Sequence, residues 1–138
     1  MSNRKLLVVE DNAHDKELIE LELAGKYDDV RFVSTLAAAR EAMKQNQPDA
    51  VLLDVNLPDS KDKMDALASI KRMRTHATII IVSGRMTSEL AEQWILGNAS
   101  GCVSKDNLGT LSHEIEQGIR AHLAQVSGEK ARQSMGSA

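Results

Sequence analysis

The sequence predicts an α/β fold in which a parallel sheet carries helices on both faces. Short apolar runs typical of buried strands alternate along the 138-residue chain with longer segments of helical periodicity. Three of the runs are continuously apolar, as strands covered on both faces should be: residues 6–9, 51–53 and 79–82. We therefore expect a sheet with these three runs at its centre. In all, five strands should alternate with five helices.

The first helix should follow the first strand directly. Asn12 can cap its start, and Gly25 supplies a stop. Its apolar side is expected to comprise Leu18, Ile19 and Leu21. The next strand, at 30–33, mixes apolar and charged residues, which predicts a less buried strand at an edge of the sheet.

The second and third helices flank the central third strand. Ser34 or Thr35 opens an alanine-rich helix that extends to about Asn46. A further helix is expected at about 65–74, with its apolar residues turned inward. These helices complete the first three βα units.

In the last two βα units, residues typical of helix ends mark where the fourth helix begins and stops. Thr87 is the expected N-cap of a fourth helix, which carries Trp94 partly in the core and ends at Gly97. A short strand around Cys102 and Val103 follows. The fifth helix has one apolar stripe, formed by Leu111, Ile115, Ile119 and Leu123.

The apolar pattern stops beyond residue 124. Residues 1–124 are therefore expected to form one domain. Residues 125–138 are small and polar, which indicates a disordered tail, a linker to a further domain or a cloning remnant.

Composition excludes several classes of partner and location. A net charge of -3 and a pI near 5.8 give no electrostatic case for binding nucleic acid or an anionic membrane. No apolar run is long enough to span a membrane, and the N-terminal run is too short for a signal peptide. A single cysteine, Cys102, cannot form an internal disulfide. The expected location is the cytoplasm.

Five polar residues lie where predicted strands end. They are Glu10, Asp11, Asp54, Ser83 and Lys105. With weak strands at the edges, the simplest strand order is 2-1-3-4-5, the flavodoxin-like winding, whose switch point lies between strands one and three. The carboxylates should meet there, and Mg²⁺ is the cation expected among them, because it prefers oxygen ligands.

At this point the chain resembles the receiver domains of two-component response regulators, and the single-domain chemotaxis type is closest in size. The likeness covers roughly residues 5–123 and combines short segments in a fixed order. The segments are Glu10-Asp11, Leu53-Asp54-Val55-Asn56-Leu57-Pro58, Ile81-Val82-Ser83-Gly84 and Gly101-Cys102-Val103-Ser104-Lys105. Alone, each strand-end residue could equally be a helix cap, a turn or a surface residue. The ordered set favours the functional interpretation.

The resemblance implies a phosphorelay function. Asp54 would accept a phosphoryl group from a sensor histidine kinase or a histidine phosphotransfer protein, with Mg²⁺ or substituting Mn²⁺ as the cofactor. Glu10, Asp11, Asp54 and the backbone carbonyl of Asn56 would hold the metal. Ser83 and Lys105, with backbone N–H groups of Asn56 and Gly84, would bind phosphoryl oxygens. Such a domain catalyses its own phosphorylation and dephosphorylation without being a dedicated turnover enzyme.

The same resemblance implies a switch. Phosphorylation would change the surface of the fourth helix, fifth strand and fifth helix for an output protein or a missing output domain, in a monomer or a phosphorylation-dependent dimer. Asn56 and Arg85 occupy positions that tune phosphate lifetime. Cys102 stands at the switch position, where the family usually has an aromatic residue, and Asp106 replaces a common proline.

Two other functions fit parts of the pattern. A pseudo-receiver would keep the fold as a protein-interaction module without phosphorylation. The missing aromatic favours this alternative, and the full acidic set argues against it. A Mg²⁺-dependent aspartyl-phosphate phosphatase of the haloacid dehalogenase type shares the chemistry. Its paired aspartates two residues apart after the first strand are absent here.

Overall fold

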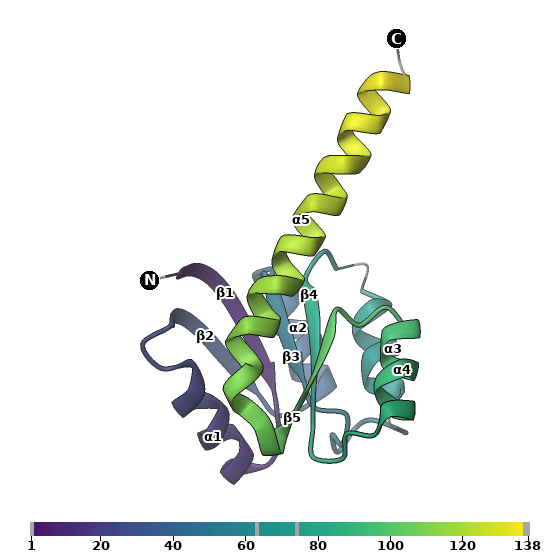
Figure 1. Ribbon diagram of the computed structural model, residues 1–138. Helices are drawn as coiled ribbons and strands as arrows, with labels where there is room; N and C mark the ends of the chain where they lie inside the picture. The colour runs from purple at the N-terminus through teal and green to yellow at the C-terminus, as the bar shows by residue number, and fades with distance from the viewer. Residues whose placement is uncertain (1, 63, 74, 137–138) are drawn as a thin grey trace.

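The computed structural model describes residues 2–62, 64–73 and 75–136, which form a five-stranded parallel sheet (Figure 1). The strand order is β2-β1-β3-β4-β5, which confirms the predicted flavodoxin-like winding. The strands are β1 (Ser2–Val9), β2 (Tyr27–Val33), β3 (Ala50–Leu53), β4 (Thr78–Ser83) and β5 (Gly101–Ser104). This order places the switch point between β1 and β3.

Helices cover both faces of the sheet. They are α1 (Ala13–Leu23), α2 (Leu36–Gln45), α3 (Asp65–Lys71), α4 (Ser88–Leu96) and α5 (Leu111–Gly136), with a short 3₁₀ helix, η1 (Lys105–Thr110), before α5. Helices α1 and α5 pack on one face, and α2, α3 and α4 pack on the other (Figure 1). Successive strand residues therefore point into different cores.

Each core joins alternate strand residues to the helices of one face. Leu53 and Ile81 pack with α2, α3 and α4, whereas Leu52 and Ile80 pack with α1 and α5. Trp94 on α4 is 0% exposed, so it lies wholly in the core where the sequence predicted partial burial. Burial on both faces explains why the central strands are continuously apolar.

The predicted helix caps are present. The side chains of Asn12, Thr35 and Thr87 each accept a hydrogen bond from the backbone N–H three residues on, at 3.0–3.1 Å. Thr35, not Ser34, is therefore the cap of α2. Gly25 follows α1 with a φ of +75°, a conformation that glycine adopts without steric cost.

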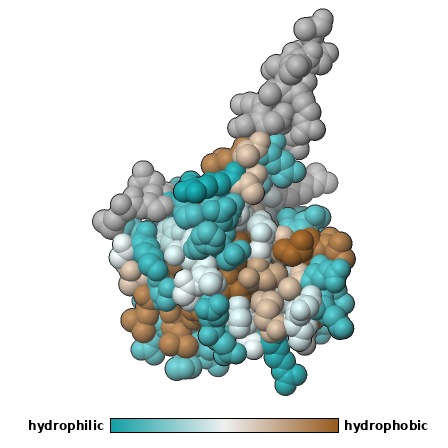
Figure 2. Space-filling view, in the orientation of Figure 1, coloured by the Kyte–Doolittle hydropathy of each residue, from teal (hydrophilic) through white to brown (hydrophobic). Residues whose placement is uncertain are grey.

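The predicted apolar side of α1 is only partly right. Ile19 and Leu23, one helical turn apart, are buried against the sheet. Leu18 and Leu21 are instead 36% and 68% exposed, because they lie outside that stripe. Figure 2 shows apolar side chains on the surface over α1 and on the α4 side, where Ile95 and Leu96 are exposed.

The ends of two helices differ from the prediction. Helix α3 ends at Lys71, whereas the predicted end at Arg74 lies outside the described residues. Helix α5 continues to Gly136 and projects beyond the sheet (Figure 1), although its apolar stripe ends near Leu123. Burial on the sheet ends at Ile119, because Leu123, predicted on the same stripe, is 53% exposed. The domain boundary at residue 124 stays a prediction.

No helix among the described residues combines the length and apolar character that a membrane span needs.

Gly118 lets α5 approach β4 closely. A Cβ added there would lie 2.6 Å from Cγ2 of Thr78 and 3.4 Å from Cβ of Ser100. We expect Gly118→Ala to lower the free energy of unfolding by about 1–3 kcal/mol through overpacking, despite alanine's better helix propensity. Urea denaturation measures this. Gly109→Ala, with open space around the added Cβ, is the control. Equal or greater stability for Gly118→Ala would contradict this packing.

Candidate functional site

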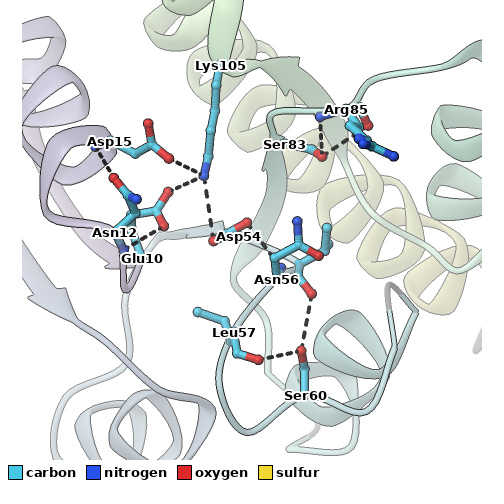
Figure 3. Close-up of polar contacts among 11 residues, drawn as sticks. Glu10, Asn12, Asp15, Asp54, Asn56, Leu57, Ser60, Ser83, Arg85 and Lys105 are labelled. Atoms are coloured by element: carbon cyan, nitrogen blue, oxygen red, sulfur yellow. Dashed lines mark hydrogen bonds and ion pairs between the residues drawn. The ribbon is translucent and has the colours of Figure 1, made fainter.

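Residues from three strand ends converge at the carboxyl edge of the sheet (Figure 3). Glu10 and Asp54 follow β1 and β3, and Lys105 follows β5. The backbone N–H of Glu10 donates to the Val33 carbonyl, and that of Asp54 donates to the Val9 carbonyl, both at 3.0 Å. These bonds extend the sheet by one residue and fix both carboxylates beside the switch point.

Three carboxylates form a cluster at this point. Oxygen atoms of Glu10, Asp11 and Asp54 all lie within 4.8 Å of one another. Glu10 and Asp54 are 2% and 3% exposed, whereas Asp11 is exposed. A hard divalent cation such as Mg²⁺ prefers oxygen ligands of this kind and keeps several waters, which the exposed side of the cluster allows. The donor set therefore fits a divalent cation.

Lys105 supplies the positive charge of the site. Its Nζ lies 2.7 Å from Oε1 of Glu10, 2.8 Å from Oδ2 of Asp15 and 3.6 Å from Oδ2 of Asp54 (Figure 3). Burial acts to lower the pKa of Lys105, but hydrogen bonds to Asp15 and Glu10 outweigh it and hold the pKa above its usual value. The ammonium is therefore charged at neutral pH.

Glu10 is buried beside the second carboxylate of the cluster, Asp54. Burial raises its pKa to about 7, and contact with Asp54 adds to the rise while Lys105 opposes it. Its Oε2 also accepts a hydrogen bond of 3.2 Å from the N–H of Asn12. A bound cation would relieve this repulsion among the carboxylates.

Ser83 lies at the same edge but contacts other groups. It ends β4 and is 2% exposed. Its hydroxyl donates to the Arg85 carbonyl at 3.1 Å and accepts from the Arg85 N–H at 3.2 Å (Figure 3). A Cβ added at Gly84 would make only an ordinary contact, 3.8 Å from Cδ of Lys105, so protein atoms alone do not require glycine there.

The loop after β3 holds Asp54 from the other side. The N–H of Asn56, an exposed residue, donates to Oδ1 of Asp54 at 3.2 Å. Further along, Ser60 donates to the carbonyls of Val55 and Leu57, which closes the loop on itself (Figure 3). The loop is thus ordered next to the acidic cluster.

Two further acidic residues contribute to this region, and no sequence pattern had marked them as site residues. Asp15 contacts Lys105, as described above. Asp59 accepts hydrogen bonds from the N–H groups of Leu36 and Ala37, at 2.9 and 3.0 Å, and so caps α2 from the loop after β3. These bonds hold the pKa of Asp59 below its usual value. Both contacts join segments distant in sequence, which local patterns do not report.

The predicted switch position holds a half-buried thiol. Burial raises the pKa of Cys102 from 9.0 to about 11, and the charge of Glu114 adds to the rise. At neutral pH the folded protein should contain about 100-fold less thiolate than an unperturbed cysteine. We expect a thiol reagent such as Ellman's reagent to react correspondingly slowly with the native protein and rapidly in denaturant. Equal rates in the two states would show that the thiol is neither buried nor influenced by Glu114.

Comparison with known proteins identifies the family of this chain. The chain matches the response regulator receiver domain over residues 6–116. It is 28% identical over 122 residues to the transcriptional regulatory protein KdpE of Staphylococcus aureus, covering 86% of this chain and 52% of KdpE. It is 26% identical over 121 residues to the response regulator protein PilR of Pseudomonas aeruginosa, covering 87% of this chain and 27% of PilR. The chain thus spans about half or less of these relatives.

A solved structure supports the fold independently. The N-terminal domain of a response regulator/sensory box/GGDEF three-domain protein from Carboxydothermus hydrogenoformans superposes with a TM-score of 0.75 and 23% identity. The similarity covers 89% of this chain and 99% of that one. With the family match over most of its length and the acidic cluster at the switch point, the chain belongs to the response regulator receiver domain family of two-component systems.

Proposed function

We propose that this receiver domain accepts a phosphoryl group on Asp54 from the phosphohistidine of a sensor kinase or a histidine phosphotransfer protein. The observation that carries the proposal is the position of Asp54. It is buried in the acidic cluster with Glu10 and Asp11, and its Oδ2 lies 3.6 Å from the Lys105 ammonium. A carboxylate placed in this way combines a nucleophile with a cation for developing phosphate charge.

The chemistry follows from these groups. A carboxylate oxygen of Asp54 attacks phosphorus, the N–P bond to the donor histidine breaks, and the histidine leaves with the bonding electrons. Mg²⁺, or Mn²⁺ in its place, held by Glu10, Asp11, Asp54 and the Asn56 carbonyl, would supply charge neutralisation of the phosphoryl oxygens. Lys105 stabilises the same negative charge, and backbone N–H groups of Asn56 and Gly84 can donate to it.

Phosphorylation is then coupled to a change of surface. The Ser83 hydroxyl is hydrogen-bonded to the backbone of Arg85. To bind a phosphoryl oxygen, this hydroxyl must give up those hydrogen bonds, and the loop before α4 shifts as a result. Cys102 has no bulky ring to change rotamer. We infer that Ser83 and Lys105 transmit the change to α4, β5 and α5, where exposed Ile95 and Leu96 offer apolar area to a partner.

The wider context of the domain belongs to the same proposal. KdpE and PilR are longer than the matched segment, which supports an output protein or output domain as the recipient of the signal. The single cysteine suits a reducing compartment, and we propose the cytoplasm. Monomer and phosphorylation-dependent dimer are both compatible with such a role.

Intact-mass spectrometry after incubation with acetyl phosphate and Mg²⁺ tests the proposal. We expect the protein to gain the mass of one phosphoryl group, and to gain none when EDTA replaces Mg²⁺. The adduct should be lost in acid and in base, as an acyl phosphate is. No mass gain at any donor concentration would instead identify a pseudo-receiver, the alternative that the cysteine at position 102 favours.

A further inference from the structure

Asp15 is an acidic residue of the site that lies outside the carboxylate cluster. It belongs to the first turn of α1, where its backbone N–H donates to the Asn12 side chain. Its Oδ2 accepts a hydrogen bond from Lys105 Nζ at 2.8 Å, with 26% of the Asp15 side chain and 14% of the Lys105 side chain exposed. The contact joins residues 90 positions apart and is partly shielded from water.

The distances show how the ammonium is shared. Nζ of Lys105 is 2.7 Å from Glu10 and 2.8 Å from Asp15, but 3.6 Å from Asp54. The ammonium thus lies closer to Glu10 and Asp15 than to Asp54, with which it forms a longer ion pair (Figure 3). It donates a hydrogen bond to Asp15 and forms an ion pair with Glu10, and neither carboxylate is the proposed phosphoacceptor.

We propose that Asp15 is a positioning residue that competes with the phosphoryl group for Lys105. The inference rests on the proposed function and deepens it, because it assigns a regulator of that same site. A phosphoryl group on Asp54 needs a donor from Lys105, and charge-assisted bonds of this kind are strong. Of the two carboxylates that now hold the ammonium, Glu10 belongs to the metal cluster, whereas Asp15 does not.

The competition predicts the direction in which Asp15 changes the affinity for the phosphoryl group. When the ammonium moves toward the phosphoryl group, the Asp15 bond weakens, and that cost lowers the affinity of the site for the phosphoryl group. Removing the Asp15 charge removes the cost. Since an ion pair that is partly open to solvent contributes up to about 1 kcal/mol, Asp15→Asn should bind a phosphoryl mimic up to about fivefold more tightly.

Titration with beryllium fluoride at saturating Mg²⁺, followed by calorimetry, tests this inference. Asp15→Asn should show the tighter binding, whereas Asp15→Glu, which keeps a carboxylate for Lys105, should stay near wild type. Glu17→Gln is the matched control, because Glu17 is an exposed acid on the same helix and its loss changes the net charge equally. A purely structural role for Asp15 predicts the opposite result, a loss of affinity in Asp15→Asn.

The outcomes separate the two proposals. Wild-type affinity in Asp15→Asn, or an equal gain in Glu17→Gln, would overturn the competition by Asp15 while the phosphorelay function stands. A wild-type protein that binds no beryllium fluoride would overturn the proposed function, and the role of Asp15 with it.

Discussion

Asp54→Asn is expected to abolish phosphorylation and leave the fold intact. An amide is nearly the same size as a carboxylate but is not a nucleophile toward phosphorus. Its oxygen can still accept the hydrogen bond that Asn56 now donates to Asp54. Loss of one charge from the cluster also reduces repulsion, so stability should not fall. Intact mass after acetyl phosphate treatment, with circular dichroism for folding, measures both effects.

Asp59→Asn provides the control for this substitution. Asp59 is an exposed acid in the same loop, and its role here is to cap α2. Asparagine keeps one of the two acceptor oxygens, so it can still accept from one of the two N–H groups while Thr35 continues to cap α2. This variant should therefore fold and accept a phosphoryl group as the wild type does. Phosphorylation of Asp54→Asn at wild-type stoichiometry would remove Asp54 from its proposed role.

Metal binding should depend more on Asp11 than on Glu10. Asp11 is exposed and can face a cation directly, whereas Glu10 is buried and already paired with Lys105 at 2.7 Å. We expect Glu10→Ala to weaken Mg²⁺ binding about tenfold, as loss of a water-mediated or outer ligand does. Asp11→Ala should weaken it more, because a direct oxygen ligand is lost.

Calorimetric titration of both variants with Mg²⁺ measures this order. Glu17→Gln again serves as a charge-matched control and should bind like the wild type. Wild-type affinity in both Asp11→Ala and Glu10→Ala would leave no metal site at the cluster. A greater loss in Glu10→Ala would reverse the assignment of the direct ligand.

Much of the fold was predictable because its signals are local. Asn12 and Thr87 cap helices through bonds three residues away, and continuously apolar runs mark strands covered on both faces. The convergence of Glu10, Asp54 and Lys105 was also predictable, since strand order determines which strand ends meet.

Other features depend on contacts that local patterns do not contain. Asp15 has the sequence environment of a first-turn helix acid, and only the folded structure brings it to Lys105. Ser83 sits at the predicted strand end, but the rotamer that bonds it to Arg85 could not be inferred. The rotation of α1 about its own axis, which leaves Leu21 exposed, depends on how the helix packs on the sheet.

Chemical mapping of the phosphorylated residue tests the central claim most directly. Sodium borohydride reduces an aspartyl phosphate to homoserine, so peptide mass spectrometry after phosphorylation and reduction identifies the modified position. We expect homoserine at position 54 in the Mg²⁺-treated protein, and none when EDTA is present. Homoserine at another aspartate, with Asp54 unmodified, would contradict the assignment of the buried carboxylate beside Lys105 as the phosphoacceptor.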